Sequence, residues 1–236
     1  MFEQRLAGVW DLIYREGRGK DYRAEADLVA KIIRDRRPDA ASLLDVGCGT
    51  GEHLTALSGL FDHVEGVDLS ESMISVARAK LPGVPLHVGD MRDFDLRRTY
   101  DAVVSLYTVV GYLPSLEALG AAVGRMVGHL APGGVLIVEP WWFAERFIDG
   151  YIAGDVVRGE GCTVSRVSRT RRREDRAHMD IHYVVADRHG VEHFTETHVF
   201  GLWTREEYVQ AFEEAGCAVE YVEDTLYCGM FVGRRR

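Results

Sequence analysis

Short apolar runs alternate with segments of helical periodicity through the first 140 residues of the chain. Runs of strand length occur at "ASLLDV", "HVEGVD", "VPLHV", "YDAVVSL" and "GVLIVEP". Apolar residues recur at helical spacing in "DYRAEADLVAKIIRDRRPD", "EHLTALSGL", "ESMISVARAKL" and "SLEALGAAVGRMVGHL", the last closed by "APGG". Ser70 precedes the third of these segments as a plausible N-cap. Strands that alternate with helices predict a parallel α/β sheet, covered by helices on both faces.

The pattern changes between about Tyr151 and Trp203. Three segments, "GCTVSRVSRTRRRED", "RAHMDIHYVVADRHG" and "VEHFTETHVFGLW", carry β-branched residues with partial period-two alternation, which predicts antiparallel strands joined by short loops.

The last part of the chain returns to the first pattern. "TREEYVQAFEEAGC" predicts a helix with a capping box formed by Thr204 and Glu207, and "AVEYVED" and "YCGMFVG" predict two final strands. We therefore expect one α/β domain, residues 1–140 and 204–236, that carries an antiparallel β insertion, residues 141–203.

Composition narrows the possible partners. A net charge of −9 disfavours general affinity for nucleic acid. No apolar run approaches the roughly 20 residues of a transmembrane helix, and the first residues lack the features of a signal peptide. Four scattered cysteines show no C-x-x-C spacing. We expect a cytoplasmic protein with neither a nucleic-acid nor a membrane partner.

Four of the five histidines in the strand-rich segment are candidate metal ligands. His178 and His182 share one face of a predicted strand, whereas His193 and His198 fall on opposite faces of the next. No acidic residue completes a ligand set, so no metal site is expected.

A glycine-rich turn follows the first predicted strand. A dinucleotide-binding turn fails because Glu52 stands where its third glycine should be. The pattern D-x-G-x-G-x-G fits Asp45, Gly47, Gly49 and Gly51. Glycines allow close approach of a ligand, and a carboxylate beside them favours a ligand that carries a cation.

Two further acids end the next two strands. Asp68 follows the turn by about 20 residues, where a carboxylate can accept hydrogen bonds from both ribose hydroxyls. Asp90 ends the third strand, within reach of an adenine amino group. A nucleoside with a cationic tail is the ligand that these features predict, and S-adenosylmethionine is such a ligand.

The motifs "LLDVGCGTG", "GVDLS" and "GDMRDF", with the late β-hairpin, resemble the class I S-adenosylmethionine-dependent methyltransferases. The resemblance implies a Rossmann-like seven-stranded sheet with its last strand antiparallel. It also implies that Tyr22 lies next to the methionyl end of the cofactor. The cofactor-binding residues expected are Tyr22, Asp45, Gly47, Gly49, Gly51, Asp68, Leu69, Met73, Asp90, Met91 and Leu106.

A narrower resemblance runs nearly end to end. "GRGKDY", "GDMRDF", "VGYL", "VEPWWF" and "FVG" occur in the order found in the nucleotide-sugar N,N-dimethyltransferases that make TDP-desosamine and TDP-mycaminose. The resemblance implies that two methyl groups pass stepwise from S-adenosylmethionine to the amine of a TDP-linked amino-deoxysugar, leaving S-adenosylhomocysteine. It further implies that the insertion helps to bind the substrate and joins two subunits in a homodimer.

The same resemblance suggests catalytic candidates. Tyr112, in "GYL", is expected to position the amine more than to act as a base, and a partly buried structural tyrosine is the alternative. Tyr14 and Lys20 lie in an early segment that can close over the site. For Lys20, a solvated lysine before a helix is an equal alternative.

The substrate-binding candidates lie in and before the insertion. Trp141 and Trp142 follow the fifth predicted strand, and we expect one to anchor the insertion and the other to line the acceptor pocket. Arg166 and Arg169 belong to a basic run that could hold a phosphorylated ligand, although such a run is usually a solvated strand.

The chain departs from the family pattern at two positions. Phe2 is the nearest counterpart of a tyrosine that approaches the reacting amine, and Cys228 stands where an arginine is expected to meet phosphate. The sugar isomer, the position of the amine and the phosphate contacts therefore remain open.

Two other functions also stay open. One is a methyltransferase that acts on a sugar hydroxyl or on a small free amine. The other is a non-catalytic module that binds S-adenosylmethionine and uses its insertion as a dimerisation surface.

Overall fold

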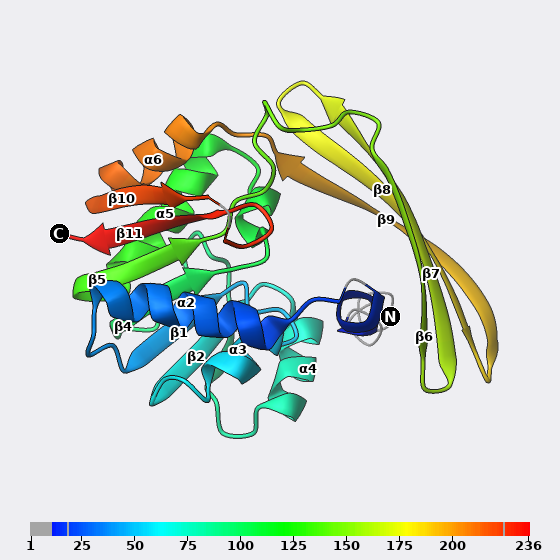
Figure 1. Ribbon diagram of the computed structural model, residues 1–236, viewed down its shortest axis with the longest axis horizontal. Coiled ribbons are helices and arrows are strands. Elements are labelled where there is room, and N and C mark those ends of the chain that lie inside the picture. Colours follow the sequence, from blue (N-terminus) through cyan, green and yellow to red (C-terminus); the bar gives the residue numbers. More distant parts are fainter. Residues whose placement is uncertain (1–10, 18, 224) are drawn as a thin grey trace.

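The computed structural model describes residues 11–17, 19–223 and 225–236, so Phe2 lies outside the described residues. The chain forms a seven-stranded sheet flanked by helices and a separate four-stranded sheet that projects to one side (Figure 1).

The seven-stranded sheet has the predicted parallel character. Its strands are β1 (Ser42–Val46), β2 (His63–Asp68), β3 (Leu86–Val88), β4 (Tyr100–Ser105), β5 (Leu130–Val138), β10 (Cys217–Val222) and β11 (Met230–Arg235). They lie in the order β10-β11-β5-β4-β1-β2-β3. Strand β11 runs antiparallel to both of its neighbours, β10 and β5. This confirms the Rossmann-like sheet with an antiparallel last strand.

Helices cover both faces of this sheet because successive strand residues point to opposite faces. On one face, Leu43 of β1 packs with Val29 of α2 (Tyr22–Arg36) and Ile74 of α4 (Glu71–Lys80). On the other, Leu44 packs with residues of α5 (Leu116–Gly128) and α6 (Arg205–Glu214). The short helix α3 (Glu52–Leu57) belongs to the first layer. The buried strands are therefore apolar on both faces.

Two predicted helix starts are confirmed. The Ser70 hydroxyl accepts the backbone N–H of Met73 at the start of α4. Thr204 and Glu207 form the capping box of α6. Strand β5, by contrast, begins at Leu130, so "APGG" lies inside the strand, because its residues form a bulge where the register against β4 shifts.

The insertion is an antiparallel sheet of four strands in sequence order: β6 (Ile152–Gly159), β7 (Cys162–Arg173), β8 (Arg176–Asp187) and β9 (Gly190–Gly201). Three of them were predicted. Strand β6 was missed because Gly154 and Asp155, both poor strand formers, interrupt its pattern. All four strands lie within residues 141–203, although the exact division into domains stays a prediction.

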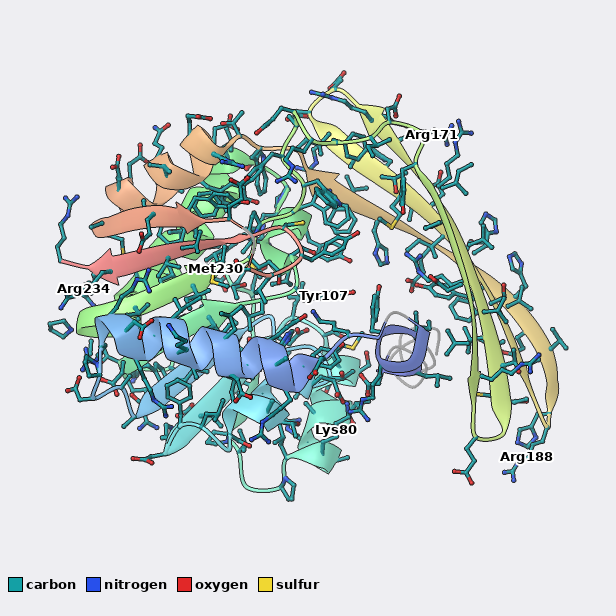
Figure 2. The ribbon with its side chains drawn as sticks, in the orientation of Figure 1. Lys80, Tyr107, Arg171, Arg188, Met230 and Arg234 are labelled. Atoms are coloured by element: carbon teal, nitrogen blue, oxygen red, sulfur yellow. The ribbon has the colours of Figure 1, made fainter. Side chains whose placement is uncertain are left out.

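The inner face of the insertion turns toward the main domain. Its residues Val164, Ile181, Tyr183 and Phe194 form a small core with Ile13 of the short π-helix η1 (Ile13–Gly17). Figure 2 shows Tyr107 at the edge of the main domain that faces the insertion. Within the described part of the chain, no helix is long and apolar enough to cross a membrane.

Candidate active site

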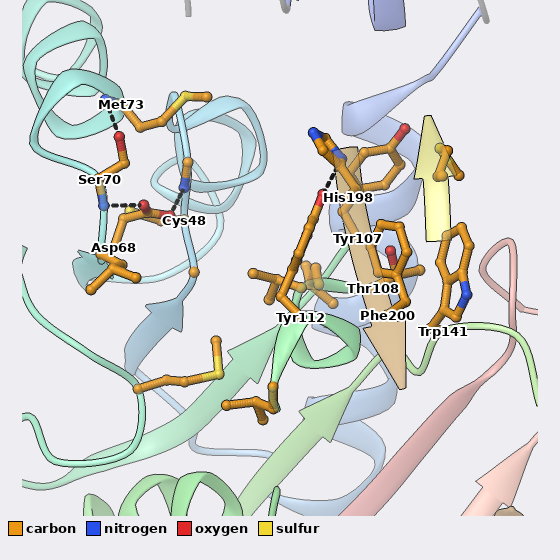
Figure 3. A pocket seen from close by; sticks show the side chains of 18 of the residues that line it. Cys48, Asp68, Ser70, Met73, Tyr107, Thr108, Tyr112, Trp141, His198 and Phe200 are labelled. Carbon is orange, nitrogen blue, oxygen red and sulfur yellow. Dashed lines mark hydrogen bonds between the residues drawn. The ribbon is translucent and has the colours of Figure 1, made fainter. Parts of the chain in front are cut away.

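A cavity of about 1090 Å³ lies between the carboxyl ends of the parallel strands and the inner face of the insertion. Ligands bind at this edge of open α/β sheets. In Figure 3, one end of the cavity carries Cys48, Asp68, Ser70 and Met73, and the other carries Tyr107, Thr108, Tyr112, Trp141, His198 and Phe200. The cavity therefore has one end built by the glycine-rich turn and another built largely by the insertion.

The three glycines of the turn adopt a left-handed conformation, with φ of +80° at Gly47, +54° at Gly49 and +80° at Gly51. A Cβ atom on Gly47 would lie 2.7 Å from Val109, so packing requires a glycine there. Gly49 has open space on that side and lines the cavity. Gly51 packs against α4 and does not line the cavity. Close approach of a ligand is therefore a property of Gly49, whereas Gly51 shapes the turn.

Asp68 is held by the backbone of the turn. Its two carboxylate oxygens accept the N–H groups of Gly49 and Ser70, each at 2.8 Å. Burial raises the pKa of Asp68, and these two hydrogen bonds act against the rise. The side chain is thereby oriented toward the cavity before a ligand arrives.

Asp45 and Asp90 occupy different electrostatic settings. Burial raises the pKa of Asp45 to about 7, and the neighbouring Asp68 adds to the rise. A cationic ligand would reverse this effect by stabilising the ionised form. Asp90 pairs with Arg92, which lowers its pKa. Both aspartates line the cavity, so a ligand that reaches Asp90 also meets Arg92.

Most of the other expected cofactor residues also line the cavity. They are Tyr22, Leu69, Met73, Met91 and Leu106. Tyr22 stands at the start of α2 against His53, with ring centroids 4.8 Å apart. Burial raises the pKa of Tyr22 above its usual range.

The two candidates in the early segment, Tyr14 and Lys20, lie in different environments. Tyr14 lines the cavity and makes an edge contact with the ring of Tyr107 at 5.1 Å. Lys20 does not line the cavity. Its ammonium donates to both carboxylate oxygens of Glu25 at 2.7 Å and lies 4.2 Å from the centroid of Tyr107. Lys20 is therefore a buried ion-pair partner, neither the substrate contact nor the solvated lysine that the sequence suggested.

Tyr112 joins the two sheets across the cavity. It ends the 3-10 helix η2 (Val109–Tyr112), and its hydroxyl lies 2.8 Å from Nδ1 of His198 in β9. The ring of Phe200 packs against Tyr112 at 4.5 Å. Tyr112 and His198 both line the cavity.

Both tryptophans line the cavity, which differs from the expected division. Trp141 also stacks on Phe200 of the insertion, with ring centroids 4.1 Å apart. It therefore both anchors the insertion and lines the cavity. Trp142 packs edge-on against Tyr227. The core residue of the aromatic run is Phe143, which is buried among the rings of the main domain.

The two arginines point to opposite faces of β7, because they are an odd number of residues apart. Arg166 is 4% exposed and lines the cavity. It donates to the hydroxyl of Ser168 and the sulfur of Met179, and within the described residues its Nε has no hydrogen-bond partner. Arg169 is exposed on the outward face, so it does not line the cavity.

Cys228 does not occupy the place expected of a phosphate ligand. Its side chain is buried outside the cavity lining, and burial raises the pKa of its thiol to about 12. The adjacent Tyr227 lines the cavity instead.

Sequence reasoning missed several cavity residues, notably Tyr107, Glu196 and Phe200. A usable signal existed only for Glu196, His198 and Phe200, whose period-two spacing places them on one face of their strand. Among the described residues, no group of three or more His, Cys, Asp or Glu side chains could hold a metal ion.

The comparisons with known proteins agree with this geometry. Residues 43–134 match the family model described as a methyltransferase domain. The chain is 50% identical, over 99% of both chains, to a dTDP-3-amino-3,4,6-trideoxy-alpha-D-glucopyranose N,N-dimethyltransferase of Streptomyces venezuelae. It is 44% identical to a dTDP-3-amino-3,6-dideoxy-alpha-D-glucopyranose N,N-dimethyltransferase of Streptomyces fradiae, over 94% of this chain and 87% of the relative.

One of the similar solved structures contains the cofactor. CalS10 with bound S-adenosylmethionine, an amino pentose methyltransferase from Micromonospora echinaspora involved in calicheamicin biosynthesis, is 52% identical with a TM-score of 0.86 over 93% of each chain. The resemblance found in the sequence is thus confirmed. The chain belongs to the S-adenosylmethionine-dependent methyltransferases, in the family of the dTDP-amino-sugar N,N-dimethyltransferases.

Proposed function

We propose that the protein transfers two methyl groups in succession from S-adenosylmethionine to the amine of a TDP-linked amino-deoxysugar in antibiotic sugar biosynthesis. The observation that carries this proposal is the 50% identity to a named N,N-dimethyltransferase over 99% of both chains, because the match includes the insertion. A match limited to the cofactor domain would support methyl transfer without indicating the acceptor.

In this proposal the glycine-rich end of the cavity binds the cofactor. Asp68 accepts the ribose hydroxyls, and Asp90 accepts the adenine amino group. The buried carboxylate of Asp45 attracts the positive charge of the methionyl end. Gly49 allows the ligand to approach the backbone, since open space lies on its cavity side. Tyr22, Leu69, Met73, Met91 and Leu106 enclose the nucleoside.

The other end of the cavity binds the nucleotide sugar. Arg166 supplies a buried positive charge whose hydrogen-bond acceptors are an uncharged hydroxyl and a thioether, so its guanidinium is suited to the diphosphate. Trp141 and Trp142 provide flat apolar walls for the base or sugar. Arg169 has no part in this binding, since it points outward.

The chemistry requires a neutral amine in line with the methyl–sulfur bond. The sulfonium is already a good electrophile, so alignment supplies much of the rate. Tyr112 and Tyr14 both line the cavity and can orient the amine. A sugar hydroxyl is a poorer acceptor, because its methylation calls for a strong base or a metal.

The function is tested by mass spectrometry after incubation with S-adenosylmethionine and a panel of TDP-3-amino and TDP-4-amino deoxysugars, with hydroxyl sugars and free amines alongside. We expect one amino sugar to gain the mass of two methylene units. Methylation of a hydroxyl sugar or a free amine alone would contradict the proposal. Cofactor binding without any product would favour the non-catalytic alternative.

The proposal includes a cytoplasmic homodimer joined through the insertion. The outward face of β6, β7 and β8 exposes Val156, Val167 and Val184, which are 69%, 49% and 38% exposed. Grouped apolar residues on a strand face support a protein interface. Light scattering should give twice the monomer mass, and a Val167→Glu variant should give the monomer. A wild-type monomer at working concentration would exclude the dimer.

A further inference from the structure

Three side chains form a hydrogen-bonded chain along the cavity wall. The hydroxyl of Tyr112 lies 2.8 Å from Nδ1 of His198, and Nε2 of His198 lies 3.0 Å from a carboxylate oxygen of Glu196. All three residues line the cavity. Tyr112 comes from the main domain and the other two residues come from β9. These hydrogen bonds therefore exist only because the insertion folds over the site.

With His198 neutral, these contacts fit one arrangement of hydrogens. The carboxylate of Glu196 can only accept, so Nε2 of neutral His198 carries the hydrogen and donates it. Nδ1 is then an acceptor and receives the hydroxyl hydrogen of Tyr112. The phenol oxygen keeps its lone pairs free, so Tyr112 can accept a hydrogen bond from a group in the cavity.

The surroundings keep the phenol in its neutral form. Desolvation of the hydroxyl and the nearby Glu196 raise the pKa of Tyr112 above its usual range and Arg166 lowers it, although 43% of the residue is exposed. The other titratable groups that act on the phenol are Tyr14 and Tyr183. Tyr112 is thus a proton carrier that does not itself become a phenolate, and a base behind it must take the proton.

His198 and Glu196 meet that requirement. The side chain of His198 is 16% exposed and that of Glu196 is 22% exposed, so the imidazole lies largely buried between the phenol and the carboxylate. A carboxylate hydrogen-bonded to an imidazole fixes its tautomer and stabilises the imidazolium that forms on protonation. The Phe200 ring packs against Tyr112 at 4.5 Å and helps to hold the phenol in place.

We propose that Tyr112, His198 and Glu196 form a proton relay that removes the proton from the acceptor amine before each methyl transfer. The inference rests on the proposed function, since only an amine acceptor presents this proton. An alkylammonium ion has no lone pair, so it must lose a proton before it can attack. The sulfonium repels the ammonium charge and favours this loss.

Each methyl transfer begins with the loss of the amine proton. The ammonium gives a proton to the Tyr112 oxygen while the phenol hydrogen passes to Nδ1 of His198, and the imidazolium pairs with Glu196. The amine lone pair then forms the N–C bond, and the C–S electrons leave on sulfur as the neutral thioether. The methylated nitrogen takes over the positive charge of the sulfonium and is again an ammonium, and His198 returns its proton to solvent. A second cofactor then permits the second transfer.

The relay is tested with His198→Asn, whose amide can keep the hydrogen bond to Tyr112 but cannot take up a proton. We expect kcat to fall about 10- to 100-fold at neutral pH, with an unchanged Kd for S-adenosylhomocysteine by calorimetry. The loss should shrink as the pH rises, because bulk solvent then deprotonates the amine, and monomethylated product should accumulate. His189→Asn, in the exposed turn between β8 and β9, is the matched control and should behave as wild type.

Glu196→Gln provides a second variant that preserves the shape of the site. It should lower kcat by a smaller factor with the same dependence on pH. Equal losses at every pH in both variants, or no loss, would overturn the relay while wild-type turnover upholds the proposed function. A wild-type enzyme that methylates no amino sugar would overturn the proposed function and the relay together.

Discussion

The backbone N–H of Gly49 donates a 2.8 Å hydrogen bond to the carboxylate of Asp68. This bond ties the glycine-rich turn after β1 to the end of β2, the two places that the proposed cofactor must contact together. A second N–H, from Ser70, orients the other oxygen of the same carboxylate. A carboxylate that is already oriented reduces the entropic cost of binding the ligand.

Replacement of Asp68 should therefore weaken cofactor binding more than it weakens the fold. We expect Asp68→Ala to raise the Kd for S-adenosylmethionine about 10- to 100-fold, as hydrogen bonds to a charged group contribute about 1.5–3 kcal/mol. Isothermal titration calorimetry measures this change. Asp62→Asn, an exposed aspartate just before β2, is the control, and an equal effect in both variants would remove Asp68 from the cofactor site.

Cofactor affinity should also depend on the ionisation of Asp45. Burial and Asp68 raise its pKa to about 7 in the empty site, whereas a cationic ligand favours the ionised form. Below that pKa, binding must displace a proton, so affinity should rise with pH by up to about tenfold per unit and level off above it. Calorimetry over a pH series should show this slope in the wild type and a flatter one in Asp45→Asn.

The cofactor end of the site could be predicted because its signals are local. The glycines, the acid before them and the acid that ends the next strand are separated by fixed numbers of residues along β1 and β2, so the fold brings them together wherever it forms. The helix caps at Ser70 and Thr204 were predictable for the same reason, since each cap involves residues three positions apart.

The acceptor end depends on contacts that no local pattern encodes. The bond between Tyr112 and His198 joins residues 86 positions apart, so His198 was interpreted as a plain strand residue. Lys20 was misjudged because its partner Glu25 lies on the following helix and draws the ammonium under Tyr107. Arg169 was grouped with Arg166 by composition, although strand alternation alone would have separated them.

The buried Glu139 should make the empty protein less stable at higher pH. Burial raises its pKa to about 7, and the hydrogen bond that the N–H of Tyr107 donates to one oxygen offsets only part of this rise. A pKa above that of the unfolded chain contributes stability at low pH that is lost as the pH rises through 7.

Glu139→Gln removes this dependence while keeping an acceptor for Tyr107. Between about pH 5 and pH 8, the free energy of unfolding of the wild type should fall by about 2–3 kcal/mol more than that of the variant. Urea titrations without cofactor measure both slopes. The raised pKa of Asp45 also lowers stability as the pH rises. The unfolding free energy of the double variant with Asp45→Asn should therefore depend even less on pH. Identical slopes in wild type and Glu139→Gln would contradict the assignment.

Arg166 and Arg169 offer a matched pair on opposite faces of one strand. Arg166→Met should raise the KM for the nucleotide sugar about 10- to 100-fold, because a charge-assisted hydrogen bond to the diphosphate is lost. The Kd for S-adenosylhomocysteine should not change. Arg169→Met should leave the KM for the sugar unchanged. Steady-state kinetics with the accepted sugar compare them, and equal KM values for the two variants would exclude Arg166 as the phosphate contact.

The aromatic run after β5 should separate into binding and stability effects. Phe143 is 2% exposed among the rings of the main domain, so Phe143→Ala should cost about 3–5 kcal/mol of unfolding free energy. Trp141 stacks on Phe200 and lines the cavity, so Trp141→Ala should instead lower kcat/KM for the sugar while cofactor affinity is retained.

Trp141→Phe should recover part of this loss, because a smaller ring can still stack on Phe200. Urea unfolding and steady-state kinetics on the three variants measure the two effects independently. If Trp141→Ala reduced stability as much as Phe143→Ala and left kcat/KM unchanged, Trp141 would be a core residue. The acceptor pocket would then begin at Trp142, whose edge contact with Tyr227 closes the same end of the cavity.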